Sequence, residues 1–226
     1  MQTLPKVPVS RIVGFTAPPL VLLVLALVGL WLKETSFHET EIQVSQYLSH
    51  LESPFLDALT LAIAYAFAPF YAAILTLTVS LWLGYKQNWF SAVYFTWIVL
   101  WAWLGAAIIK PLVSRPRPNA ELLFDPLAPV PGVLSFPSGH TAFAVGFFVA
   151  LALFFTPVKD HPKAVLLAYF GVAIVGFSRV HVGAHFVTDT LAAAIAGSMG
   201  VLFAVTLAES TMPPPSEQIN APAAGK

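Results

Sequence analysis

Cysteine is absent from the 226 residues, and charged side chains make up only 10% of them. Without cysteine the chain can form no disulfide and can use no thiolate as a nucleophile. Positive and negative side chains balance at 11 each, so no surplus of cations is available to bind the phosphates of a nucleic acid. The composition therefore excludes cysteine-dependent catalysis and argues against a nucleic-acid partner.

Hydrophobic residues make up 58% of the chain, and they gather in long runs. An ordinary soluble domain has about 25% charged residues, and one helix crosses a bilayer with about 20 mainly apolar residues. Six segments are interpreted as spans: 12–32, 55–84, 89–109, 141–155, 163–177 and 186–207. They lack the alternation of a β-barrel strand, so we expect an all-α bundle of six transmembrane helices.

The chain is short enough for one membrane domain, which we place at residues 1–208. Residues 209–226 are rich in proline and small polar side chains, so we expect a disordered tail. The first span follows basic residues, as a signal peptide does, but no small-x-small cleavage pattern ends it. We therefore expect an uncleaved first helix. Pro69 interrupts the second span, where we expect a kink within one helix.

Basic residues gather on one side of the predicted membrane. Six spans place both termini on one side, and that side carries Lys6, Arg11, Lys86, Lys159, Lys163 and Lys226. Because an excess of lysine and arginine in short loops marks the cytoplasmic face, we expect both termini to be cytoplasmic. On the opposite side, Ile42, Tyr47, Leu48 and Leu51 are spaced as in a short amphipathic helix at the interface.

The opposite side carries Lys33 and four further cations that we assign to a site: Lys110, Arg115, Arg117 and Arg179. Any one of them could extend to the lipid headgroups. The stretch "FPSGHTAF" adds Ser138 and Gly139 before a predicted helix, with His140 in its first turn. A serine cap and a flexible glycine at a helix start expose free N–H groups, which favour an anion. Together these features predict an oxyanion site.

His185 and Asp189 are four residues apart in "SRVHVGAHFVTD", which would place them on one face of a helix. There the carboxylate can hold one ring nitrogen protonated and leave the other free to attack phosphorus. A buried pair kept for packing is the alternative, although ionisable groups at membrane depth are costly. His181, four residues earlier, would complete three zinc ligands, but the cations would repel a divalent ion. We therefore predict no metal, and we expect His181 to lie at the interface or just outside the direct contacts of the site. We also expect Gly183 to break the helix between His181 and His185.

The order of these features resembles the three-part signature of the type 2 phosphatidic acid phosphatase (PAP2) family. Its parts are, in order, Lys110 with "RP" at 117–118, "PSGH" at 137–140, and "SR" at 178–179 with His185 and Asp189. The resemblance covers residues 110–189 by motif, and the rest of the chain by helix count alone. It implies a PAP2-like bundle and the chemistry of a phosphatase.

The resemblance also implies a role for each residue. His185 would be the nucleophile that becomes phosphohistidine, Asp189 would orient it, and His140 would protonate the leaving oxygen and then activate water. The phosphoryl oxygens would be held by Lys110, Arg117, Ser138, Gly139 and Arg179. Arg115 lies inside the first motif but at no fixed position, and we expect it to be a further contact to the phosphate or headgroup. No metal or other cofactor is implied.

A site at the ends of spans suits a lipid phosphate, because the tail can stay in the leaflet while the phosphate enters between helices. The similarity to bacterial members implies undecaprenyl pyrophosphate, phosphatidylglycerol phosphate or phosphatidic acid as the substrate. It also implies a place in the bacterial inner membrane. The charge pattern described above then places the site on the extracytoplasmic side. A membrane transporter of anions or lipid phosphates is the alternative from another class. Such a transporter would not need two histidines and an aspartate at these spacings. The oligomeric state cannot be read from the sequence.

Overall fold

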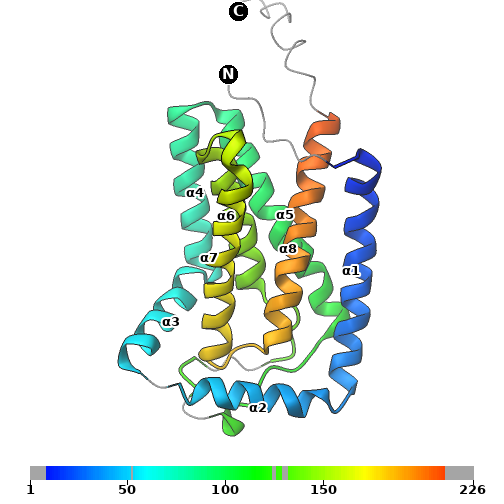
Figure 1. The fold of residues 1–226 in the computed structure, drawn as a ribbon, viewed down its shortest axis with the longest axis vertical. Coiled ribbons are helices and arrows are strands. Elements are labelled where there is room, and N and C mark those ends of the chain that lie inside the picture. Colours follow the sequence, from blue (N-terminus) through cyan, green and yellow to red (C-terminus); the bar gives the residue numbers. More distant parts are fainter. Residues whose placement is uncertain (1–8, 52, 124–125, 129–131, 212–226) are drawn as a thin grey trace, which may run out of the picture.

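The computed structural model describes residues 9–51, 53–123, 126–128 and 132–211, and within these ranges the chain is helical without strands (Figure 1). The α-helices are α1 (Arg11–Glu34), α2 (Phe37–Ser49), α3 (Pro54–Ala66), α4 (Pro69–Lys86), α5 (Trp89–Val113), α6 (Gly139–Phe155), α7 (His161–His181) and α8 (Val187–Thr211). Short 3-10 helices are η1 (Ala120–Leu122) and η2 (Val158–Asp160). The predicted all-α class is confirmed. Residues 212–226 of the predicted tail lie outside the described residues, and α8 continues past the predicted domain end at residue 208.

The predicted count of six spans is not confirmed. Four helical segments are long and apolar enough to cross a membrane, namely α1, α5, η2 with α7, and α8. A fifth is reached only if α3 and α4, which are bent by 68° at their break, are taken as one span. The expected kink at Pro69 is therefore a helix boundary, because proline lacks an N–H and is suited to the first turn of a new helix. α6 is apolar but has only 17 residues.

The core of the bundle is formed by α5, α6 and α8, with α7 packed on α6 (Figure 1). α5 and α8 approach each other closely at glycines. A Cβ added to Gly200 would lie 2.1 Å from the carbonyl oxygen of Trp101, and one on Gly105 would lie 2.5 Å from that of Ala196. Small residues are the usual means by which membrane helices pack closely without a hydrophobic driving force between them. The contact fixes Lys110, at the end of α5, relative to the start of α8.

The two described ends of the chain lie at one end of the bundle. The Arg11 guanidinium at the start of α1 donates to the carbonyl oxygen of Glu209 near the end of α8, at 3.3 Å. The α7–α8 connection lies at the other end, where α2 runs across the bundle (Figure 1). The predicted helix α2 is confirmed, but its buried face carries Glu41 and Ser45, while Tyr47 is 69% exposed. The cytoplasmic placement of the termini stays a prediction.

Candidate functional site

The connection between α7 and α8 is a tight turn that presents His185. Gly183 has φ +78°, and a Cβ there would lie 2.9 Å from the Cδ1 atom of Leu123, so the turn requires glycine. The backbone N–H groups of Ala184 and His185 both donate to the carbonyl oxygen of Arg179, at 3.1 and 3.2 Å. His185 therefore lies in a turn. The four-residue spacing had predicted that His185 and Asp189 share one face of a helix, and this was wrong. The break at Gly183 was predicted correctly.

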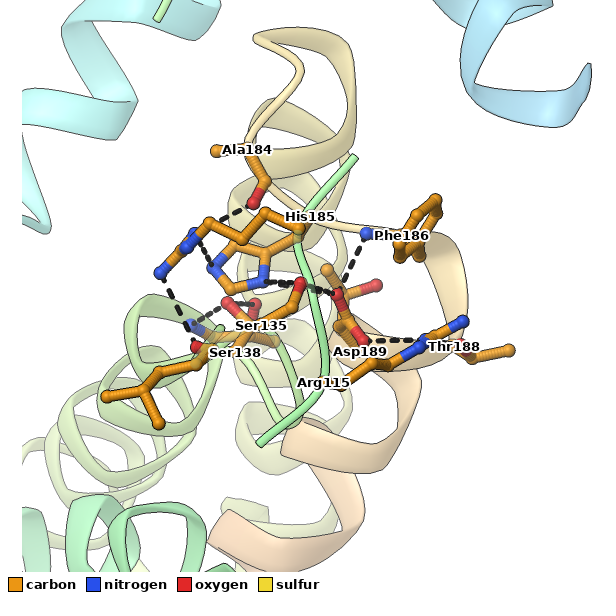
Figure 2. A network of polar contacts seen from close by, with 12 residues as sticks. Arg115, Ser135, Ser138, Ala184, His185, Phe186, Thr188 and Asp189 are labelled. Atoms are coloured by element: carbon orange, nitrogen blue, oxygen red, sulfur yellow. Dashed lines mark hydrogen bonds and ion pairs between the residues drawn. The ribbon is translucent and has the colours of Figure 1, made fainter. Parts of the chain in front are cut away.

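Asp189 nevertheless reaches His185, because it stands at the third position of α8 and points back towards the turn (Figure 2). Its Oδ2 atom accepts from the backbone N–H of Phe186 at 2.9 Å, as a carboxylate does in a capping box. The same oxygen lies 3.3 Å from His185 Nδ1 and accepts from the hydroxyl of Ser135. Asp189 is completely buried. The helix start thus holds the carboxylate against the imidazole.

The protonation of the imidazole follows from its two neighbours. Arg117 Nη1 lies 3.2 Å from His185 Nε2, and a guanidinium can only donate, so Nε2 carries the lone pair and Nδ1 carries the proton towards Asp189. Burial lowers the pKa of His185 to about 4, against the raising effect of Asp189 and with the help of the Arg117 and Arg179 charges. The ring is therefore neutral near pH 7, with its lone pair on Nε2.

His185 lies at the polar end of a cavity of about 590 Å³. The other polar groups at this end are Lys110, Arg117, the Gly139 backbone and His140. Lys110 Nζ donates to the carbonyl oxygen of Leu134 at 2.8 Å, which fixes the position of the ammonium group. The remaining walls come from α4, α5, α6 and the α3–α4 break, and they are mainly apolar: Phe67, Pro69, Leu77, Val99, Leu100 and Phe143 are among them. The cavity can take an amphiphile with an anionic head.

Two further predicted phosphate-binding residues lie beside the cavity and not in its lining. Ser138 is buried, and its Oγ caps α6 by accepting from the backbone N–H of Thr141 at 3.5 Å. Arg179 is 4% exposed, and its Nε is buried without a hydrogen bond among the described residues. The Arg179 charge is near enough to contribute to the low pKa of His185.

Comparison with known proteins identifies the family. Residues 91–212 match the PAP2 superfamily, so the match covers more than half of the chain. It includes all of the predicted site residues, from Lys110 to Asp189. The chain belongs to the PAP2 superfamily. With its several apolar helices, it is a multi-pass integral membrane protein of that superfamily.

Two relatives illustrate the similarity in sequence. A lipid A 1-phosphatase from Rhizobium etli is 33% identical over 128 residues, which are 54% of this chain and 52% of that protein. Phosphatidylglycerophosphatase B from Bacillus subtilis is 36% identical over 89 residues, which are 37% of this chain and 41% of that protein. The chain thus spans about half the length, or less, of the curated relatives it matches.

Solved structures show the PAP2 fold over more of the chain. A transmembrane PAP2 type phosphatidylglycerolphosphate phosphatase from Bacillus subtilis matches with a TM-score of 0.71 and 21% identity, over 88% of this chain and 98% of that one. LpxE from Aquifex aeolicus matches with a TM-score of 0.59 and 18% identity, over 77% and 97% of the two chains. The PAP2-like fold predicted from the motifs is confirmed.

The structure places Arg115 away from the expected phosphate contact. It does not line the cavity, and its Nη1 and Nη2 atoms are paired with the carboxylates of Asp189 and Glu41. The spacing of "RPRP" could not reveal this, because the two arginines are only two residues apart and turn in opposite directions. Arg117 faces His185, whereas Arg115 faces the other side of Asp189.

His181 does not line the cavity. It is buried, with Nδ1 3.2 Å from the carbonyl oxygen of Leu48 and Nε2 3.0 Å from Asp57 Oδ1. Both ring nitrogens are thus turned to α2 and α3, away from His185. Among the described residues, no group of three histidine, cysteine, aspartate or glutamate side chains is arranged to hold a metal ion.

Sequence reasoning missed three polar residues around Asp189. Ser135 comes just before the "FPSGH" motif, Thr188 lies inside the last motif, and Glu41 is about 150 residues away along the chain. One feature of the sequence could have drawn attention to Glu41: it is a carboxylate next to Ile42 on a helix predicted to be amphipathic. Nothing in the sequence pairs it with Arg115, so only the fold could show that contact.

Proposed function

We propose that this PAP2 protein is a membrane lipid phosphatase that works through a phosphohistidine at His185. The observation that carries the proposal is the cavity, whose cationic end holds a neutral imidazole while its other walls are apolar. A phosphate would meet Lys110 and Arg117 at that end, and an acyl or prenyl chain would lie along α4 and α5. Both relatives named above are phosphatases of lipids, which agrees with this division of the cavity.

In the first step, Nε2 of His185 would attack phosphorus while the bond from phosphorus to the lipid oxygen breaks. His140, which lines the same end of the cavity, would give its proton to the departing lipid oxygen. Burial and the neighbouring cations lower the pKa of His140, so it would gain this proton only once the anionic phosphate is bound. Asp189 would stabilise the positive charge that the ring gains when Nε2 bonds to phosphorus. Charge on the transferring phosphoryl oxygens would be held by Lys110 and Arg117, since electrostatic stabilisation is the main task in phosphoryl transfer.

In the second step, His140, now neutral, would take a proton from water as the water oxygen attacks phosphorus. The bond between phosphorus and Nε2 then breaks, which returns the lone pair to His185 and releases inorganic phosphate. Arg117 Nη1 donates to Nε2 of His185, so it would have to release that contact and turn to a phosphoryl oxygen when Nε2 attacks phosphorus. Its fork suits such a contact, because guanidinium groups bind phosphate bidentately.

A substrate panel tests the proposal. We expect the purified protein in detergent to release inorganic phosphate from one or more of phosphatidic acid, phosphatidylglycerol phosphate, undecaprenyl pyrophosphate and lipid A phosphate. EDTA should leave the rate unchanged, because every group assigned to the reaction belongs to the chain. If no lipid phosphate is hydrolysed and the protein instead carries anions across a vesicle membrane, the transporter becomes the better interpretation.

The apolar part of the cavity predicts a dependence on chain length. Ala73 lines the cavity from α4, and Ala73→Trp would fill the space assigned to the tail. We expect the KM for a long-chain lipid phosphate to rise about tenfold, a plausible cost for one blocked apolar contact surface, while a short-chain analogue is hydrolysed as before. Ile74→Trp is the matched control, because Ile74 is exposed on α4 and does not line the cavity. Equal KM changes for both chain lengths would contradict this assignment.

A further inference from the structure

Asp189 is connected through Arg115 to a second buried carboxylate, Glu41 of α2. Arg115 Nη1 donates to Asp189 Oδ1 at 2.9 Å, and Nη2 pairs with Glu41 Oε2. Thr188 completes the network, since it accepts from Arg115 Nη1 at 3.0 Å and its hydroxyl donates to Glu41 Oε1. The exposed fractions are 1% for Arg115, 5% for Glu41 and 0% for Asp189. One cation thus lies between two buried anions.

Arg115 lies on the side of Asp189 that faces away from His185 (Figure 2). Its guanidinium carbon is 4.5 Å from the centroid of the Phe186 ring, which it stacks against. The Phe186 ring and the two carboxylates surround the guanidinium. Both Nη atoms are therefore occupied, and the guanidinium cannot contact a ligand in the cavity. Arg115 can therefore influence the reacting atoms only through Asp189.

Stability alone is a weak reason for this arrangement. Desolvation of buried ions is costly, and a well-packed apolar cluster of similar volume often stabilises a protein equally well. The position of the charges is more informative. Arg115 attracts the negative charge of Asp189 away from His185, whereas Glu41 attracts the charge of Arg115 away from Asp189. The stabilisation that Asp189 gives to a positive charge on the imidazole should therefore depend on Glu41, although Arg115, Asp189 and His185 all lie between Glu41 and the substrate.

We propose that Arg115 and Glu41 are positioning residues, which orient Asp189 and set how strongly it supports the charge on His185. The helix α2 then takes part in the active site although it contacts no reacting atom. This inference rests on the proposed function of His185, but it can be tested separately because it concerns the protonation of the ring.

The direction of the effect follows from the signs of the charges. The ionisable groups around the ring and behind Asp189 come from every element packed there: Lys110, Arg115, Arg117, His140, Arg179, Asp189 and Glu41. With the pKa of His185 at about 4, kcat/KM should fall as the pH drops through that value, because protonated Nε2 cannot attack. Removal of a negative charge destabilises the protonated ring and moves this fall to lower pH. Removal of a positive charge moves it to higher pH.

Glu41→Gln is the decisive variant, because the amide keeps the size of the side chain and an oxygen for Arg115 Nη2. We expect the acid-side midpoint of kcat/KM to move down by about half a pH unit, less than the shift of one or more units that a directly adjacent charge causes. For Arg115→Gln we expect a move of about one unit in the opposite direction. The matched control is Glu39→Gln, which removes the same charge from an exposed position on α2 and should leave the profile unchanged.

The ring of His185 should be titrated directly as well, by ¹⁵N NMR of histidine-labelled protein in detergent. This measurement does not require turnover, so it decides the inference even if the wild-type protein hydrolyses none of the lipids tested. Opposite shifts for Glu41→Gln and Arg115→Gln support the inference. Shifts in the same direction, or a Glu41→Gln midpoint equal to that of Glu39→Gln, overturn it. If Arg115→Gln does not fold, the comparison of Glu41→Gln with Glu39→Gln still decides.

Discussion

His185→Gln is expected to lower kcat by about 10⁴-fold or more, since loss of an enzymatic nucleophile typically has effects of this size. Glutamine fills much of the space of the imidazole, but it offers no nitrogen lone pair to phosphorus. The covalent intermediate should disappear together with turnover. The measurement is a rapid quench with ³²P-labelled lipid phosphate, which should label the wild-type protein with an acid-labile, base-stable phosphoryl group and leave the variant unlabelled.

His161→Gln is the control for this experiment. His161 begins α7 at the opposite end of that helix from the α7–α8 turn, and its Nε2 atom lies 3.2 Å from the carbonyl oxygen of Thr156. We expect its activity and labelling to match the wild type. A labelled His185→Gln protein, or one that keeps a tenth of the wild-type kcat, would show that another group attacks phosphorus. The substrate binding assigned to Lys110 and Arg117 could survive such a result, but the phosphohistidine at His185 could not.

The part of the site that lies close together in the sequence was predictable. Lys110 and Arg117 lie just before and just after the end of one helix, and Gly139 and His140 begin another. The predicted span ends and the capping preferences were therefore enough to place these residues on one side of the membrane. His185 also reached the predicted place, although through a turn and not along a helix. The error arose because the four-residue spacing of His185 and Asp189 fits both a helix and a capped turn, and the αL glycine at position 183 decides between them.

The contacts that depend on tertiary packing could not be predicted. Glu41 meets Arg115 only because α2 runs across the end of the bundle, and periodicity gives the direction of a helix face but not its partner. The predicted span count was not confirmed for a related reason. α6 is too short to pass as a span by length, and its place in the centre of the core follows from its neighbours. The break before Pro69 likewise depends on how α3 and α4 pack, since a proline alone permits either a kink or a new helix.

Asp189→Asn is expected to lower kcat by about 10³- to 10⁴-fold, comparable to the same substitution in other enzymes where aspartate orients a catalytic histidine. In the wild type, Oδ2 accepts from three directions and Oδ1 accepts from Arg115. An amide has one oxygen, so in either orientation its NH₂ group must face a donor. With NH₂ towards Arg115, the guanidinium loses an acceptor. With NH₂ towards the turn, the backbone N–H of Phe186 and the ring of His185 lose theirs.

The substitution should therefore also lower the free energy of unfolding, by about 1–3 kcal/mol for a buried donor left without an acceptor. Thermal unfolding in detergent measures this loss, and Asp160→Asn is the control, because Asp160 lies in η2 before α7 and is not part of the network. We expect KM to change little, since Asp189 does not line the cavity. A variant that loses stability but keeps its kcat would mean that Asp189 holds the turn in place without supporting the charge on His185. A large fall in kcat at a temperature where the variant remains folded would assign Asp189 to the reaction itself.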